Sequence, residues 1–436
     1  MRRSRTFAYL TLICLAAAHT PLAAEEADPP PAVDERIEAE VAALLQDPRM
    51  QAGLRHIVDL EDENLADLVE LTEIPAPPFK EQARGARFAE LLREAGLTKV
   101  SIDAVGNVIG RRPGRPGNRT VAYSAHLDTV FPEGTDVTVR VDGSRYSAPG
   151  VGDNSRGLVT VLGVLRAMQH ARIQTRADVL FIGNVGEEGL GDLRGMKYLF
   201  SEDGPGIDTL IAVDGGRSDR IVFAGIGSHR YRVIFRGPGG HSWGAFGTAN
   251  PLHALGRAIA VFVDEAAEVT ADGEKSSYNI GRAGGGTSVN AVPFEAWAEI
   301  DIRSGDRAKI EDIERLLMRA VDRALVAENA ARTEGEALTV EVLRVGSRPA
   351  AKGDPEITVV QRAVAATRAF GIEPRLRSSS TDANLPLSLG IPAVAMSRGG
   401  ISGNSHAPTE WWENVDGHVA IQIGLLTLVA EAGLAR

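Results

Sequence analysis

The sequence predicts an α/β protein: a mixed, mostly parallel sheet sandwiched by helices, with a smaller α+β domain inserted into it. Three observations lead to this fold class. Short β-rich runs alternate with helical stretches between residues 120 and 213, a β-α-β-β-α series interrupts the alternation, and the alternation then resumes. The 436 residues amount to roughly two or three domains of about 150 residues each. Apolar residues make up 44% and charged residues 24%, as in ordinary folded proteins.

Residues 1–24 have the features of a secretory signal peptide. Arg2, Arg3 and Arg5 precede an apolar run at residues 7–18, and small residues lead to Ala23-Ala24. The run is shorter than the ~20 residues that span a bilayer, which favours cleavage over anchoring. We therefore expect an exported protein, periplasmic or secreted, with no membrane attachment after cleavage; the Arg2-Arg3 pair leaves the export route open.

Charge and cysteine content narrow the function classes. The formal net charge is −11, and removal of the three signal arginines makes it −14. This excess of negative charge argues against nucleic acid and anionic membranes as partners. The single cysteine, Cys14, lies in the signal, where the large Ile13 before it disfavours lipidation. The mature chain thus has no thiolate, and any metal site must use histidines and carboxylates.

Periodicity places the elements in order along the chain. An acidic, Pro-rich leader at residues 25–31 precedes the first helices, and we assign residues 25–50 to leader and first helix. The larger domain covers residues 51–226 and 346–436, and the inserted domain covers residues 227–345. The expected helices are 33–45, 60–71, 88–95, 158–169, 195–200, 251–263, 307–327, 355–370 and 415–434. The expected strands are 100–102, 120–124, 179–182, 209–213, 231–235, 277–281, 294–302 and 393–396.

The first group of candidate site residues follows the strand at residues 120–124. Residues two apart in an extended segment face the same way, so His126 and Asp128 can share one site. Open α/β sheets bind ligands at such carboxyl ends. An Asp beside a His ligand commonly orients its ring.

A Gly-rich turn at residues 150–157 brings in Asp153, whose carboxylate could bridge two cations about 3.5–4 Å apart. Asp153 or Asn154 could instead be a helix N-cap. Glu187 and Glu188 are adjacent and follow the buried strand at residues 179–182. Two neighbouring carboxylates are costly there unless a positive group such as a metal ion lies between them. One can ligate a metal while the other moves a proton.

Two single residues complete the group: Asp214 at another strand end, and His406 late in the chain. Each is weak evidence alone, and together the clusters supply two imidazoles and several carboxylates. This ligand set suits zinc, with cobalt or manganese possible by substitution. Four further histidines, His19, His56, His170 and His418, have no comparable setting.

The order of these motifs resembles the zinc-dependent M20 metallopeptidases, which include carboxypeptidase G-like, aminotripeptidase-like and acetylornithine deacetylase-like enzymes with a zinc-exopeptidase-like fold. The resemblance runs from about residue 61 to the end. It implies two zinc ions per chain, with His126 and Asp214 on one, Glu188 and His406 on the other, and Asp153 bridging them. It further implies that Asp128 orients His126, that Glu187 is the general base, and that the peptide bond Asp153-Asn154 is cis.

The inserted domain is similar to the family's lid and dimerisation domain. By that resemblance His241, in the run Gly237-Pro238-Gly239-Gly240-His241-Ser242, reaches the reacting carbonyl, often in the partner subunit's site of a homodimer. Asn290 and Arg303 would contact polar groups of the substrate, Arg303 by a two-pronged hydrogen bond to a carboxylate. The alternatives without a function are a residue at a strand end for His241, a hairpin turn for the Gly-rich run before Asn290, and an ordinary surface residue for Arg303.

Two segments depart from the family pattern and bear on the substrate pocket: residues 378–384, with Ser378-Ser379-Ser380 in place of a Gly-rich stretch, and Trp411-Trp412. The resemblance implies cleavage of an amide bond in a small peptide by metal-activated water, with Glu187 as base. An N-acyl amino acid deacylase or desuccinylase is the first alternative. A non-catalytic binding protein is disfavoured, because all five ligand positions are occupied.

Overall fold

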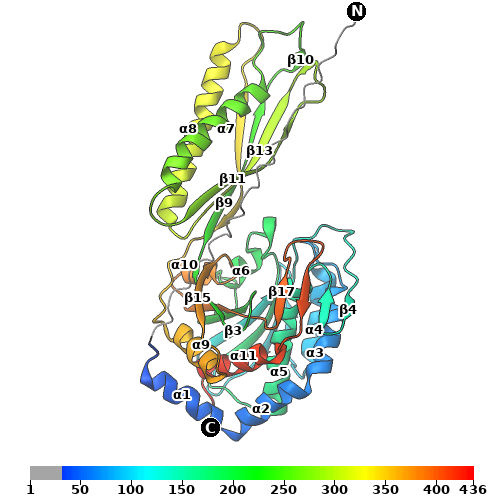
Figure 1. Ribbon diagram of the computed structural model, residues 1–436, viewed down its shortest axis with the longest axis vertical. Helices are drawn as coiled ribbons and strands as arrows, with labels where there is room; N and C mark the ends of the chain where they lie inside the picture. Colours follow the sequence, from blue (N-terminus) through cyan, green and yellow to red (C-terminus); the bar gives the residue numbers. More distant parts are fainter. Residues whose placement is uncertain (1–31) are drawn as a thin grey trace, which may run out of the picture.

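The computed structural model describes residues 32–436. The expected signal peptide, the leader at residues 25–31, Cys14 and His19 lie outside the described residues. Figure 1 shows a larger α/β body from which a smaller body of helices and strands projects. The fold class expected from the sequence is confirmed.

The larger body is built on an eight-stranded sheet. In spatial order its strands are β1 (Val100–Ile102), β2 (Val108–Arg112), β6 (Asp178–Asn184), β3 (Thr120–His126), β7 (Thr209–Val213), β16 (Ala393–Met396), β8 (Arg220–Gly225) and β15 (Arg375–Ser379). The four central strands β6, β3, β7 and β16 run parallel. All residues of these four strands are buried, as expected when helices cover both faces.

The two faces of this sheet carry unequal helical layers. The thicker layer contains α1 (Glu35–Gln46), α2 (Pro48–Asp59), α3 (Glu61–Thr72), α4 (Gln82–Glu94), α5 (Gly157–His170), α9 (Thr358–Ala369) and α11 (Gly417–Ala432). The other face is covered by the short helices α6 (Arg194–Leu199) and α10 (Asn384–Ser388). None of the helices between residues 32 and 436 has the length and apolarity needed to cross a bilayer.

The smaller body is a four-stranded antiparallel sheet backed by two long helices on one face (Figure 1). Its strands, in spatial order, are β11 (Ser276–Gly285), β13 (Glu295–Ser304), β9 (Gly227–Arg236) and β14 (Thr339–Arg348), and its helices are α7 (Pro251–Thr270) and α8 (Arg307–Ala331). The fourth strand, β14, extends the β-α-β-β-α series expected from the sequence. It is an edge strand with many exposed side chains, so its apolar signal is weak.

The far end of the smaller body carries a two-stranded ribbon of β10 (Gly240–His241) and β12 (Ala291–Val292). In Figure 1 this ribbon lies at the end opposite the eight-stranded sheet.

Two chain segments join the bodies, one between β8 and β9 and the other just after β14. They are paired: Gly225 N donates to Ala351 O at 2.8 Å, and Ala351 N donates to Gly225 O at 2.9 Å. The connection is therefore a short two-stranded ribbon.

A second small antiparallel sheet lies on the larger body. It contains, in spatial order, β17 (Ile401–Gly403), β18 (Trp411–Glu413), β5 (Arg145–Ser147) and β4 (Arg140–Asp142). Trp412 is fully buried in it and donates its indole N–H to Gly399 O at 2.8 Å. Trp412 thus has a packing role, and the turn between β17 and β18 presents His406.

Candidate functional site

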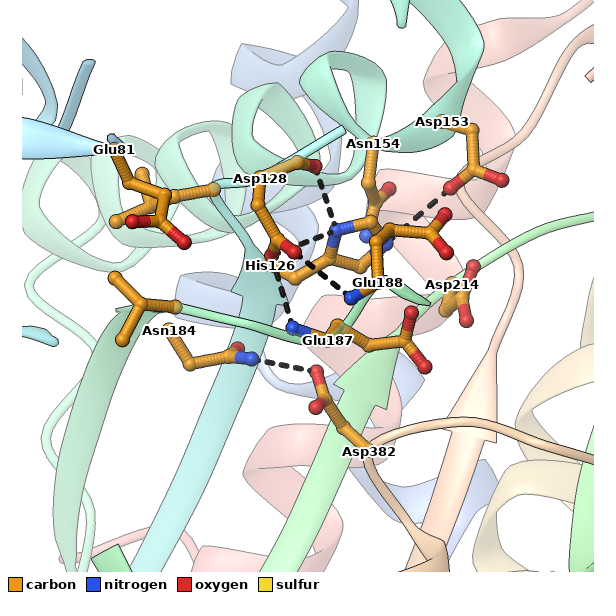
Figure 2. Close-up of polar contacts among 12 residues, drawn as sticks. Glu81, His126, Asp128, Asp153, Asn154, Asn184, Glu187, Glu188, Asp214 and Asp382 are labelled. Atoms are coloured by element: carbon orange, nitrogen blue, oxygen red, sulfur yellow. Dashed lines mark hydrogen bonds and ion pairs between the residues drawn. The ribbon is translucent and has the colours of Figure 1, made fainter. Parts of the chain in front are cut away.

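The candidate residues meet at one edge of the main sheet because β6, β3 and β7 are parallel neighbours. His126 is the last residue of β3, Asp214 follows β7 directly, and Glu187 and Glu188 follow β6. Parallel strands end at the same edge, so the side chains that follow them converge, as Figure 2 shows. Asp153 joins them from the turn Val151–Arg156 that precedes α5.

Potential ligand atoms in this region form three groups within 4.8 Å: His126 with Glu187 and Glu188, His126 with Asp153 and Asp214, and Asp153 with Glu188 and His406. Asp153 therefore belongs to two groups. His126 Nε2 lies 3.2 Å from Asp153 Oδ1, and His406 Nε2 lies 3.4 Å from Asp153 Oδ2. His406 Nε2 also lies 2.9 Å from Glu188 Oε1.

Asp128 ties the end of β3 to the end of β6. Its fully buried carboxylate accepts the backbone N–H of Glu187 at 3.0 Å on Oδ1 and that of Glu188 at 2.8 Å on Oδ2. His126 Nδ1 contacts the backbone carbonyl of Asp128 at 3.0 Å and its carboxylate at 3.6 Å. One side chain thus holds the Glu187-Glu188 backbone and lies against the ring of His126.

Glu410 holds the backbone of the turn that carries Asp153, as Asp128 holds the backbone of Glu187 and Glu188. Its buried carboxylate accepts the backbone N–H groups of Gly150, Gly152 and Asp153 at 2.8–3.0 Å. Burial raises the pKa of Glu410, and the hydrogen bonds from this turn oppose the rise. The peptide bond Asp153-Asn154 is cis, which confirms the expectation from the sequence. Neither residue caps α5; instead Asn154 Nδ2 donates to Val213 O at 2.8 Å.

Glu187 is paired with an arginine that the sequence analysis missed. Arg348 Nη1 lies 2.8 Å from Glu187 Oε1, Arg348 Nη2 donates to the carbonyl of the same glutamate, and both side chains are buried. Burial and the nearby charge of Glu188 raise the pKa of Glu187 well above its usual range, while Arg348 opposes the rise. Arg348 is the last residue of β14, so the smaller body supplies a direct contact to this carboxylate.

A second buried arginine, Arg398, faces the oxygens of the other group. Its Nη1 lies 3.2 Å from Asp153 Oδ1 and 3.6 Å from Asp214 Oδ1. Hydrogen bonds to Asp153 and Glu188 raise the pKa of His406 to about 10. For His126 burial alone would lower the pKa, but contacts with Asp128 and Asp153 outweigh it and the pKa is raised. Both imidazoles therefore favour the protonated form in the metal-free protein, and metal binding would release protons.

The donor set fits divalent metal ions. His126 Nε2 is buried without a hydrogen bond, although it lies beside the oxygens of Asp153 and the other carboxylates. Carboxylates this close together repel one another, and a cation between them offsets that repulsion. Imidazole nitrogens with carboxylate oxygens are ligands that zinc, cobalt and manganese accept.

The remaining expected residues lie on the smaller body. Arg303, in β13, lines a cleft of about 330 Å³ that opens onto the cluster. His241 and Asn290 lie together at the far ribbon, where Ser242 N donates to Asn290 O at 2.9 Å, and both side chains are exposed. They do not line the cleft of their own chain.

Asp382 is a further site residue that was not expected from the sequence, although it lies in the unusual segment at residues 378–384. Asp382 is buried, and Asn184 Nδ2 donates to its Oδ2 at 2.8 Å (Figure 2). Burial raises the pKa of Asp382 to about 7. Ser379 and Ser380 of the same segment line the cleft. The motif at residues 378–384 could have suggested Asp382; Arg348, Arg398 and Glu410 lack a local motif.

Comparison with protein families matches residues 122–432 to the model described as peptidase family M20/M25/M40. Two curated proteins named as LysW-lysine/LysW-ornithine hydrolases also match: one from Pyrococcus abyssi at 36% identity and one from Pyrococcus horikoshii at 32% identity, each over 129 residues. The matched segment is 30% of this chain and spans about a third of the length of these relatives, 34% and 36%.

Solved structures share the fold over most of this chain at low sequence identity. An aminopeptidase PepT from Bacillus cereus has 22% identity and a TM-score of 0.66, covering 85% of this chain and 99% of that one. The dipeptidase Dug1p from Saccharomyces cerevisiae has 16% identity and a TM-score of 0.69, covering 88% and 98%. Human carnosine dipeptidase 1 has 15% identity and a TM-score of 0.69, covering 93% and 100%.

The double acceptor role of Asp128 can be tested with Asp128→Asn. Asparagine offers one oxygen and sets its own N–H₂ against the second backbone donor. We expect about 10–100-fold weaker metal binding and a free energy of unfolding lower by about 1–3 kcal/mol. Metal titration and chemical denaturation measure both. Asp136→Asn, at an exposed aspartate that accepts one backbone N–H, is the matched control; equal metal binding by both variants would contradict the assignment.

Proposed function

Because this chain belongs to peptidase family M20/M25/M40, and is therefore a hydrolytic enzyme, we propose that it cleaves the amide bond of small peptides with two divalent metal ions per chain, in the first place zinc. The observation that carries this proposal is the position of Asp153, whose Oδ1 faces His126 and whose Oδ2 faces His406. A carboxylate with one oxygen toward each group suits a pair of ions.

The ligand assignment uses the two of the three groups that contain Asp153. His126 and Asp214 would hold one ion, Glu188 and His406 would hold the other, and Asp153 would contribute to both. When bound, such ions supply Lewis-acid polarisation of the scissile carbonyl and lower the pKa of water. The buried backbone contacts of Asp128 and Glu410 keep the ligand loops in place before any ion binds.

Glu187 is the proposed general base. It is adjacent to the ligand Glu188 and it lines the cleft, so its carboxylate can take and return a proton beside the ligand cluster. Arg348 holds one carboxylate oxygen of Glu187, which fixes the direction of the other. Glu187 would take a proton from the attacking water and pass it to the leaving amine.

A second candidate substrate class is the N-acyl amino acids. The curated relatives with 36% and 32% identity are named for hydrolysis of LysW-lysine and LysW-ornithine. The solved structures with the same fold are instead named as tripeptidases and dipeptidases, among others. We place peptides first because several structures with this fold are named as peptidases, whereas the match to the curated relatives covers 30% of this chain.

We further propose a homodimer in which His241 of one chain completes the site of the other. His241 is exposed and lies on the far ribbon, away from the metal ligands of its own chain. Large apolar side chains nearby are almost fully exposed, namely Trp243 at 87%, Phe246 at 85% and Val289 at 102%. A self-complementary contact through this ribbon would cover them and bring His241 to a second copy.

Export is proposed from residues 1–24. The basic start, the short apolar run and the small residues before Glu25 support cleavage after Ala24.

The catalytic proposal is tested by hydrolysis of dipeptides, tripeptides and N-acyl amino acids by zinc-, cobalt- or manganese-loaded protein, with and without chelator. We expect chelator-sensitive cleavage of peptides. Glu187→Ala should keep its metal content, measured by mass spectrometry, and lose about 10²–10⁴-fold in rate. Turnover of N-acyl amino acids alone would favour the second class, and no turnover with two metals bound would contradict the proposal.

The dimer proposal is tested by complementation. Glu187→Ala and His241→Ala each remove one group from every site, and His241→Ala should lower the rate about 10²–10³-fold. Co-expression of the two variants with different tags allows purification of the mixed dimer, in which one site has both groups. Recovery of activity in the mixed dimer is expected. A monomer in sedimentation, or no recovery, would overturn the shared site.

Export is tested by expressing the full chain in a bacterial host and measuring the mass of the product in each fraction. We expect a product that begins at Glu25 outside the cytoplasm. A cytoplasmic product that keeps residues 1–24 would contradict cleavage.

A further inference from the structure

The cleft over the ligand cluster is unusually rich in arginine. Five arginines line it: Arg220, Arg230, Arg303, Arg348 and Arg398. The carboxylates of the same cleft are four in number: Asp153, Glu187, Glu188 and Asp214. The whole chain has a net charge of −11, so this concentration of positive charge is local. Divalent ions on the carboxylates would increase it further.

Most of these arginines have partners. Arg348 binds Glu187, and Arg398 faces Asp153 and Asp214, as described above. On the smaller body Arg230 Nε lies 3.0 Å from Asp301 Oδ1, and Arg303 Nε lies 2.6 Å from Asp301 Oδ2. These neighbouring carboxylates offset much of the positive charge of the four arginines.

Arg220 differs from the others. Among the residues that the structure describes, no carboxylate lies within ion-pair distance of its guanidinium; its recorded side-chain partner is Ser379, whose Oγ accepts from Arg220 Nη2 at 2.9 Å. Arg220 begins β8 and Ser379 ends β15, its parallel neighbour, so both positions belong to the main sheet. The guanidinium is held at the cleft with its other N–H groups available.

Two glycines make room for this side chain. Gly215 and Gly216, directly after Asp214, have φ of 74° and 67°, which side chains disfavour. A Cβ at Gly215 would lie 2.2 Å from Arg220 Nη1, and one at Gly216 would lie 2.6 Å from Arg220 Cδ. The side chain of Arg220 therefore packs against the backbone directly after Asp214, next to the proposed metal ligands.

We propose that Arg220, with Ser379 and Ser380, forms a carboxylate-binding subsite on the wall of the larger body, and that the substrates are dicarboxylic: peptides or N-acyl amino acids that carry one carboxylate for Arg220 and a second for Arg303. The inference rests on the proposed function. Guanidinium and hydroxyl donors together match the oxygens of a carboxylate. A substrate carboxylate would give Arg220 the counterion that no carboxylate of the described residues supplies.

The serines explain why the segment at residues 378–384 departs from a Gly-rich pattern. Ser379 orients Arg220, and Ser380 accepts from Arg348 Nη1 at 3.1 Å while it lines the same cleft. Glycine at either position would lack the hydroxyl. The segment thus sets specificity, while Asp382 a few residues later lies buried beside Asn184.

The test uses metal-loaded full-length enzyme and matched pairs that differ in one carboxylate: Glu-Ala with Gln-Ala, Ala-Glu with Ala-Gln, and N-glutaryl-alanine with N-valeryl-alanine. We expect the acidic member of at least one pair to have a kcat/KM about 10–100-fold higher. Arg220→Gln should abolish that preference, and Arg220→Lys should keep part of it. The pair that shows the preference reveals which side of the amide the subsite reads.

Arg375→Gln is the control, because Arg375 is the β15 neighbour of Arg220 and has an exposed side chain outside the cleft. It should keep the preference. Absence of preference in the wild type, or its survival in Arg220→Gln, would overturn the subsite while peptide cleavage still stands. Calorimetric titration of glutarate and valerate into wild type and Arg220→Gln needs no turnover. Tighter glutarate binding that requires Arg220 supports the subsite even if no substrate is cleaved; equal binding by both proteins rejects it.

Discussion

The structure depends on keeping several carboxylates close together inside a protein. Carboxylates at such distances repel one another, and burial removes the water that would screen them. Two features offset this repulsion. Arg348 and Arg398 bring positive charge from segments far away in the sequence. Backbone N–H groups donate to buried carboxylates that are not proposed ligands, such as that of Asp128. The ends of β3, β6 and β7 can meet at one edge only because this compensation exists.

Two buried acids, Asp128 and Glu410, share a role distinct from ligation. Each accepts backbone N–H groups from a loop that carries ligand side chains, so each fixes a loop through its main chain. Main-chain anchoring leaves the side chains of Glu187, Glu188 and Asp153 free to face the cleft. This preorganisation lowers the entropy that would be lost if the loops became ordered only with the metal.

Much of this arrangement could be predicted from local sequence. Residues 209–213 and 393–396 are short apolar runs, and the strands have these bounds. Polar residues directly after such runs predict a site at a sheet edge, which is where His126, Glu188 and Asp214 lie. The roles of Arg220, Arg348 and Glu410 could not be predicted in this way. Their partners lie far away in the sequence, and strand register and chain crossings bring them together. The distance of His241 from its own site likewise depends on the length of the smaller body.

The hydrogen-bonded pair of Gly225 and Ala351, where the two connecting segments meet, limits how the smaller body can turn relative to the larger one. Two independent strands would let the smaller body swivel about each, whereas a hydrogen-bonded pair resists torsion and permits mainly flexing across its plane. Arg348 lies three residues before Ala351 and also grips Glu187. A change in the orientation of the smaller body at this crossing would therefore also move the guanidinium that contacts Glu187.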